Sequence, residues 1–275
     1  MSRSTRIKRD IVHILMAVYI VVILFPLTWM AESGFKTNKE IFTSPWSLPS
    51  TLNPKNYVYV WQTYMAHATL NSVFFTVVGT LLVILIASMS AYALIRFHIK
   101  HRNVLFLFIL SGMMLAPQCS LVPIYKLLSI LHLYDTWIGL LLPYVAFRIP
   151  YAFFLMWSYM ITLPVEVEEA AVIDGCSIPG TFFKVVMPMC KPAVATTAIV
   201  TARYIWNDFS FVLVFTEGTN LRTVPLAIFS MRSTSQTDYG VLLAGLTLAA
   251  LPVVVFYIVL QKYFVSGASA GAVKG

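Results

Sequence analysis

Hydrophobic and polar positions along this chain of 275 residues form six long apolar stretches separated by polar segments. Each stretch holds about 20 or more residues, the length that a helix needs to cross a bilayer core of roughly 30 Å. We therefore predict an all-α polytopic membrane protein with six transmembrane helices. The predicted spans are residues 11–31, 68–95, 104–124, 137–161, 193–216 and 241–264.

Prolines and polar residues modify this pattern. The third span contains Pro117 and Pro123, so we expect it to be kinked or broken, because proline removes a helix hydrogen bond and clashes with the preceding turn. The fourth span carries Pro143 and Pro150.

Segment 32–67 is polar and contains several prolines and tryptophans. It should be a structured external loop, because every backbone polar group in lipid needs an internal partner.

Composition and charge narrow the class further. The chain is 59% hydrophobic and only 11% charged, and its mean hydropathy is +0.80; an ordinary soluble domain is roughly 25% charged. The net charge of +8 does not indicate a nucleic-acid partner, because the basic residues fall in short clusters between apolar stretches. Such clusters are typical topology signals of a membrane protein.

The basic clusters predict the orientation. Four basic residues within segment 1–10 place the N-terminus in the cytoplasm, and a second cluster at 96–102 returns the chain there after the second span. The first apolar run exceeds the roughly 7 to 15 residues of a signal peptide, so we expect a retained span. Six spans place both termini inside, with a six-span domain at 11–264 and a cytoplasmic tail at 265–275.

Several kinds of chemistry are missing from the sequence. There is no Walker A motif, HExxH, GxSxG or GxGxxG, and the three cysteines show no metal-ligand spacing. We therefore expect no cofactor on this chain and no catalytic residue, and a membrane enzyme is a weak alternative. An ion-coupled secondary transporter is a second alternative, but it would call for intramembrane carboxylates, and only Asp208 lies inside a predicted span.

The polar loop at 162–192 interrupts the membrane-like second half of the chain, and its order predicts a helix, a tight turn and a second helix. Acids near the start of the first helix suit the helix dipole, and Gly175 permits a backbone turn. The apolar residues after the turn would either bury against the body of the protein or enter a groove on a partner. These apolar residues are Phe182, Phe183, Val185, Val186 and Met187.

One spacing in this loop points to a known family. Three residues separate Glu169-Ala170-Ala171 from Gly175. Nine residues separate Gly175 from Val185, and one residue separates Val185 from Met187, which is followed directly by Pro188. This pattern resembles the EAA loop in permease subunits of binding-protein-dependent ABC importers, and Asp174 fits the carbohydrate, maltose-type branch. Val185 and Met187 replace the usual Ile and Leu. Segments 32–49, 71–72, 206–209 and 261–275 extend the resemblance over nearly the whole chain.

The resemblance implies the function and the partners. The chain would be a permease subunit in the bacterial inner membrane that imports a sugar or oligosaccharide. A second homologous permease would complete the pore, two ATPase subunits would hold ATP and Mg, and a solute-binding protein would dock outside. In the family, the EAA loop seats in a cleft of the ATPase, and the glutamate at the Glu169 position faces basic groups. The implied coupling residues are Glu168, Glu169, Ala170, Ala171, Asp174, Gly175 and Pro188. A plain solvated connector is the alternative for this loop.

Five residues are candidates for the substrate path: Arg148, Arg203, Trp206, Asn207 and Asp208. The two arginines depart from the family pattern, and a charge inside a bilayer is usually turned toward a cavity or a partner. We hypothesise that they favour an anionic substrate, such as a uronic-acid oligosaccharide or a phosphorylated polyol. Local pairing or snorkelling of the arginines, and helix packing by 206–208, are the alternatives. Asp208 could also pair with a basic residue of another helix or subunit.

Overall fold

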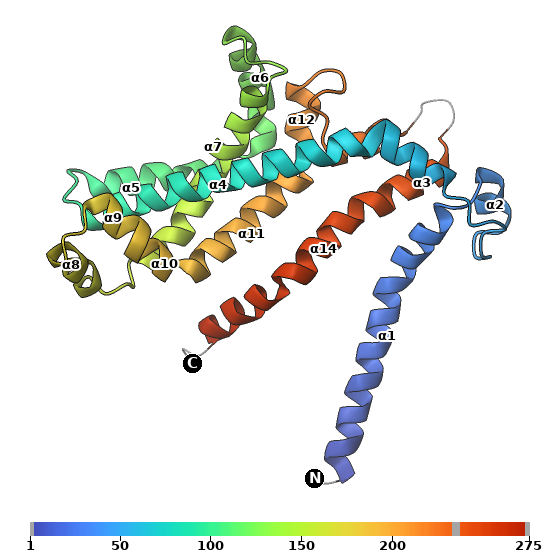
Figure 1. The fold of residues 1–275 in the computed structure, drawn as a ribbon, viewed down its shortest axis with the longest axis horizontal. Coiled ribbons are helices and arrows are strands. Elements are labelled where there is room, and N and C mark those ends of the chain that lie inside the picture. Colours follow the sequence, from blue (N-terminus) through green and yellow to red (C-terminus); the bar gives the residue numbers. More distant parts are fainter. Residues whose placement is uncertain (1–2, 233–236, 273–275) are drawn as a thin grey trace. The chain divides into compact units, whose positions relative to one another are not determined.

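The computed structural model describes the backbone of residues 3–232 and 237–272, and the side chains of residues 9–232 and 237–255. Within these ranges every regular element is a helix, which confirms the all-α class (Figure 1). The chain forms two compact units. Unit 1 comprises Met1–Ala66 and Ala227–Phe256, and unit 2 comprises His67–Leu226 and Tyr257–Gly275.

Unit 1 contains the first apolar helix and an ordered loop. It holds α1 (Arg3–Ser33), α2 (Asn38–Thr43), α3 (Lys55–Val60), the π-helical turn η1 (Trp61–Met65) and the first part of α14 (Tyr239–Ala272). Fully buried Lys36 holds the segment after α1 to the end of α1. Its Nζ lies 2.8 Å from a Glu32 oxygen and donates to the carbonyl of Pro45 at 3.1 Å. The expected structured loop is therefore present.

A capping box starts α2. The Thr37 side chain accepts from the backbone N–H of Glu40, and the Glu40 carboxylate accepts from Thr37 in return. The carboxylate also accepts from the Ser50 side chain, which ties the far end of the loop to this helix. Hydrogen bonds from Ser50 and then from Thr37 lower the pKa of Glu40 to about 2. The carboxylate thus stays ionised well below the usual range of a glutamate.

Unit 2 is organised around α7 (Trp137–Met160). This helix packs against α11 (Lys191–Asn207), α5 (Arg102–Ser111) and α12 (Ser210–Phe215). One apolar core joins α7 to the second half of α4 (Ala66–Arg96) through side chains such as Val83, Phe153 and Met156. A second core surrounds Phe75 and Tyr144 and includes α6 (Leu121–Ile130) and α12. Figure 1 shows α4, α7 and α11 as the long helices of this unit.

Asn71 and Ser72, near the start of α4, anchor the loop that follows α12. Buried Asn71 donates to the carbonyls of Asn220 and Arg222 at 2.8 and 2.9 Å. The Ser72 hydroxyl accepts from the backbone N–H of Val224 at 2.9 Å, where α13 (Val224–Ser230) begins. This pair therefore positions a segment some 150 residues further along the chain.

The predicted break in the third span is confirmed. Helices Arg102–Met114 and Pro117–Ile130 meet at 90°, with the 3₁₀ turns η2 (Gly112–Met114) and η3 (Pro117–Ser120) at the junction. Leu115 and Ala116 are extended, with ψ of 114° and 121°. The steric demand of Pro117 on the preceding residue accounts for the conformation of Ala116.

The predicted second span at 68–95 falls within α4 (Ala66–Arg96), and the helical run continues N-terminally through η1 and α3 to Lys55, where Val60 and Met65 are buried. The predicted fifth span at 193–216 is not continuous: α11 ends at Asn207, and α12 begins after Asp208. The Asp208 side chain accepts the backbone N–H of Phe211 at 3.0 Å and so starts the new helix.

The number of spans remains a prediction. Among the described residues, three helices are long and apolar enough to cross a membrane: Arg9–Ser33, Lys55–Arg96 and Trp137–Met160. The number rises to five if each of two bent helix pairs counts as one span, and Tyr239–Val255 is a further, shorter apolar helix. In the predicted tail at 265–275, α14 continues to Ala272, and residues 273–275 lie outside the described part.

Candidate functional site

Loop 162–192 folds in the predicted order of helix, turn and helix. The first helix is α8 (Glu166–Ile173). The second is built from α9 (Ile178–Thr181), the π-helical turn η4 (Phe182–Val186) and α10 (Met187–Met189). Ser177 caps α9 by accepting the backbone N–H of Gly180 at 3.3 Å. Single π-helical turns occur frequently at functional sites.

The turn at Gly175 is a Schellman motif. The N–H of Cys176 donates to the carbonyl of Ala171 at 2.9 Å, and the N–H of Gly175 donates to that of Val172 at 3.0 Å. Gly175 has φ +84°, and a Cβ added there would meet no atom within 4 Å. Glycine is therefore required for its backbone conformation and not for space.

The second helix is attached to the body of unit 2 by its apolar side chains. Phe182 and Val186 are buried in the core formed with α4 and α7, and the ring of Phe182 lies 5.2 Å from that of Tyr92 on α4. Phe183 remains 52% exposed, and Val185 and Met187 are half-buried. The structure thus answers the question left open by the sequence: two of the five apolar residues are buried against the protein itself.

The acids of α8 point in different directions. Glu168 is 8% exposed, and its Oε1 lies 2.8 Å from Nε and 2.7 Å from Nη2 of Arg96, the last residue of α4. Nη2 of Arg96 also donates to the carbonyl of Leu163 at 3.2 Å. Glu166, Glu169 and Asp174 are exposed to solvent, as are Ala170 and Pro188. In the sequence, Arg96 belongs to the basic cluster at 96–102, which indicates only the membrane orientation. Its pairing with Glu168 is seen only in the structure.

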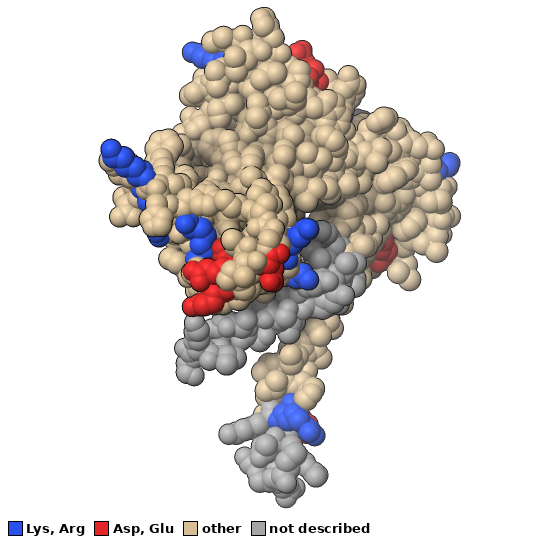
Figure 2. Space-filling model, turned by 60° about the vertical axis from the view of Figure 1, so that its left-hand side comes forward, with Lys and Arg blue, Asp and Glu red and all other residues tan. Residues whose placement is uncertain are grey.

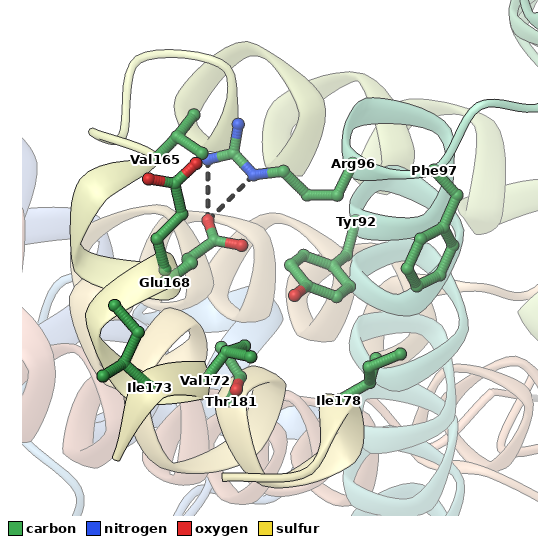
Figure 3. A pocket seen from close by; sticks show the side chains of 10 residues that line it. Tyr92, Arg96, Phe97, Val165, Glu168, Val172, Ile173, Ile178 and Thr181 are labelled. Atoms are coloured by element: carbon green, nitrogen blue, oxygen red, sulfur yellow. Dashed lines mark hydrogen bonds and ion pairs between the residues drawn. The ribbon is translucent and has the colours of Figure 1, made fainter. Parts of the chain in front are cut away.

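An open groove of about 510 Å³ lies between the end of α4 and the two helices of the loop (Figure 3). Its walls are largely apolar, and several of these side chains are strongly exposed: Ile173 at 85%, and Val172 and Ile178 at 56% each. The lining residues are Tyr92, Arg96, Phe97, Val165, Glu168, Glu169, Val172, Ile173, Ile178 and Thr181.

Charged side chains are concentrated on loop 162–192, beside this groove. Figure 2 turns the side of Figure 1 that carries α8 and α9 forward, and it shows acidic side chains gathered together with basic side chains on either side. The loop contributes the exposed acids Glu166, Glu169 and Asp174 and the exposed bases Lys184 and Lys191. Its outer face therefore combines negative charge with apolar side chains, a pattern that suits a protein partner.

The structure divides the substrate-path candidates into two local groups. The guanidinium of Arg148 on α7 lies 3.6 Å from the ring centre of Tyr204 on α11, a cation–π contact. The Nε atom of Arg148 is buried without a hydrogen-bond partner, and within the described residues no carboxylate pairs with this arginine. Arg203, one position before Tyr204, is exposed.

The second group surrounds Asp208. Its carboxylate accepts from the hydroxyl of Tyr144 at 3.0 Å and from the backbone of Phe211, so a tyrosine holds it here rather than a basic residue. Asn207 is exposed and donates to the carbonyl of Arg203 at 2.8 Å, and Trp206 is half-buried. Among the residues that the structure describes, no three His, Cys, Asp or Glu side chains cluster as metal ligands would.

Comparison with known proteins places the chain in a family. Residues 84–269 match the model of the binding-protein-dependent transport system inner membrane component. A probable ABC transporter permease, YurM of Bacillus subtilis, is 42% identical over 99% of this chain and 91% of its own length. The diacetylchitobiose uptake permease NgcG of Streptomyces coelicolor is 32% identical over 99% and 91%.

A solved structure agrees in fold over most of the length. A crystallised bacterial ABC transporter that imports the acidic polysaccharide alginate contains a chain with a TM-score of 0.80 and 25% identity. The match covers 96% of this chain and 99% of that one. The chain therefore belongs to the family of inner-membrane permease components of binding-protein-dependent ABC transport systems, and it is a transport subunit rather than an enzyme.

Proposed function

We propose that this permease subunit carries a sugar or oligosaccharide into the cytoplasm, driven by ATP hydrolysis on separate ATPase subunits. The proposal is supported by the relatives, since NgcG is a diacetylchitobiose permease and the alginate transporter imports a polysaccharide. A second permease would complete the pore, and a solute-binding protein would deliver the substrate from outside. Both termini and loop 162–192 would face the cytoplasm, as the basic clusters at 1–10 and 96–102 favour.

Loop 162–192 is the element that we propose as the docking site for an ATPase subunit. One observation carries this proposal: the loop is attached to the protein by its inner face and leaves its outer face uncovered. Phe182 and Val186 are buried in the core, while Ile173 and Ile178 are exposed beside the Glu169 carboxylate. A solvated connector needs no such exposed apolar side chains. A short helix laid into a groove of a partner would bury them.

Copurification tests the docking site directly. The double variant Glu169→Lys with Gly175→Pro reverses the exposed charge and breaks the Schellman turn, so the ATPase subunit should no longer copurify with the permease. The chain offers a matched control in Glu217→Lys with Gly218→Pro, because Gly218 is also a turn glycine, with φ +69° and open space around it. The control should retain the ATPase.

Two results would contradict the proposal. The first is retention of the ATPase by the Glu169 and Gly175 double variant. The second is uptake of substrate in cells that lack every candidate ATPase, which would favour an ion-coupled secondary transporter instead. Loss of the ATPase in both double variants would show that general misfolding explains the effect.

Arg148 supports a proposal about the charge of the substrate. We propose that Arg148, together with exposed Arg203, lies on the substrate path and favours an anionic saccharide. The support is the position of Arg148 near the middle of α7, where its charge is half-buried, lies over the Tyr204 ring and has no carboxylate partner among the described residues. A buried charge without a counterion is costly, and a substrate carboxylate would supply one.

Uptake assays with a neutral and a uronate-containing saccharide test this assignment. Ligands are first chosen by a thermal-shift screen on the cognate binding protein. Arg148→Ala should reduce uptake of the charged saccharide far more than that of the neutral one. Arg102→Ala is a matched control, since Arg102 also lies over an aromatic ring, that of Trp157 at 5.2 Å, but outside the proposed path. Equal losses for both saccharides in Arg148→Ala would leave only a packing role.

A further inference from the structure

The buried ion pair between Arg96 and Glu168 suggests how motion of the loop reaches the transmembrane helices. We propose that Arg96 is a positioning residue that locks α8 to the end of α4, so that a displacement of the docked loop moves α4 with it. This inference rests on the proposed docking of an ATPase at loop 162–192. It adds the specific link inside the permease through which the displacement passes.

The geometry of the Arg96 guanidinium is that of a three-way junction. Its Nε and Nη2 both contact Oε1 of Glu168 on α8, at 2.8 and 2.7 Å. Nη2 also holds the carbonyl of Leu163, in the chain that leaves α7, at 3.2 Å. One side chain thus joins the end of α4, the exit of α7 and the start of the docking loop. Figure 3 shows the pair in the wall of the groove.

Few side chains of α8 itself reach the body of unit 2, although the helix also packs against α9 and η4, and the Tyr92 hydroxyl on α4 also bonds Glu168. Glu168 and Ala171 are the two buried residues within α8, and Ala171 contributes only a methyl group. The side chain of Glu168 is 10% exposed and that of Arg96 is 16% exposed, so water screens the pair weakly. The hydrogen bonds of a planar guanidinium also fix the orientation of the Glu168 carboxylate relative to α4, and a lysine at position 96 would fix this orientation less well.

The two neighbouring glutamates therefore have different roles. Glu169 is exposed and so accessible to a partner, whereas Glu168 faces inward toward Arg96. A change at Glu169 should weaken docking. A change at Arg96 or Glu168 should leave docking in place but make the connection to α4 loose, so that ATP is hydrolysed with less movement of the pore.

The experiment uses the full transporter reconstituted in nanodiscs and liposomes, with its ATPase and binding protein. In Arg96→Gln and Glu168→Gln, the ATPase should still copurify, while the amount of substrate transported per ATP hydrolysed falls by about tenfold, within the usual range of coupling between protein sites. The charge exchange Arg96→Glu with Glu168→Arg should recover part of that ratio. Glu217→Gln, an exposed acid outside loop 162–192, and Arg102→Gln are the controls and should behave like the wild type.

Each other outcome overturns the inference. An unchanged transport ratio in both single variants would show that Ala171 and the apolar core suffice to hold the loop. Loss of the ATPase would make the pair part of the docking surface. If the charge exchange fails to assemble, Arg96→Lys decides instead: it keeps the charge but not the fork, and a wild-type ratio would contradict the geometric argument. Failure of the wild-type permease to bind an ATPase would instead refute the proposed function.

Discussion

The turn at Gly175 allows backbone conformation to be separated from steric contact in the proposed docking loop. Gly175 has φ +84° and an open space where a Cβ would be, so a side chain meets no neighbour and the cost is conformational. A non-glycine residue in the left-handed region costs about 1–2 kcal/mol. Asparagine tolerates this region better than alanine, and a β-branched residue tolerates it worst. The predicted order of loop stability is Gly, Asn, Ala and then Val.

The effect on function follows from the same magnitude. If the partner binds only the folded loop, destabilising that loop by about 1–2 kcal/mol reduces the apparent affinity by at most roughly 5- to 30-fold. Gly175→Pro should be worse than all of these variants, because proline fixes φ near −65° and removes the N–H that bonds the Val172 carbonyl at 3.0 Å.

Titration of the purified ATPase subunit onto permease in nanodiscs measures this affinity for the whole series. Hydrogen exchange of the peptide that spans 166–180 reports the stability of the loop in the absence of the partner. Both measurements should follow the same order. A ranking by side-chain size alone, with Asn as damaging as Val, would refute the conformational reasoning. It would show instead that the partner approaches Gly175 closely.

Two further predictions concern the loop after α12 and the segment that begins with α2. Asn71→Ala leaves two loop carbonyls without their donor, so the free energy of unfolding should fall by about 1–3 kcal/mol. A lower midpoint of thermal unfolding and faster tryptic cleavage at 217–223 should report this loss. An unchanged midpoint would contradict the prediction. Glu40→Ala should speed hydrogen exchange in peptide 37–50 at pH 7. Because the pKa of Glu40 is lowered to about 2, its bonds to Ser50 contribute above the usual pKa and are lost only as the pH falls toward 2. The wild-type difference from Glu40→Ala should therefore persist at about pH 3.5, below the usual pKa of a glutamate, and its disappearance there would refute the argument.

The helices and the turn of the docking loop were accessible from the sequence because their causes are local. Apolar length determines where a helix can span a membrane, and Pro117 disturbs the residues directly before it. The glycine after α8 marks a helix end, since only a left-handed residue closes a Schellman turn without strain. The spacing from Glu169 to Pro188 is also a local pattern, and it indicated the family that the comparisons then established.

The features that the sequence did not show involve residues far apart along the chain. The helical run extends N-terminally from α4 to Lys55, where Val60 and Met65 are buried, and periodicity does not reveal that burial. The break at Asp208 depends on a carboxylate held by Tyr144, 64 residues away. Such contacts exist only after helices have packed.

The sequence by itself determined the class of protein, the order of its helices, the helical docking loop and the transport family. These properties follow from hydropathy, turn chemistry and short-range spacing. Only the tertiary structure decided which acid of the loop faces inward, because Glu168 and Glu169 are adjacent and chemically alike. Their difference arises from Arg96, 72 residues earlier, whose guanidinium reaches one carboxylate and not the other. Burial and pairing are properties of the packed chain, and they separate Glu169, which we propose to dock, from Glu168, which pairs with Arg96.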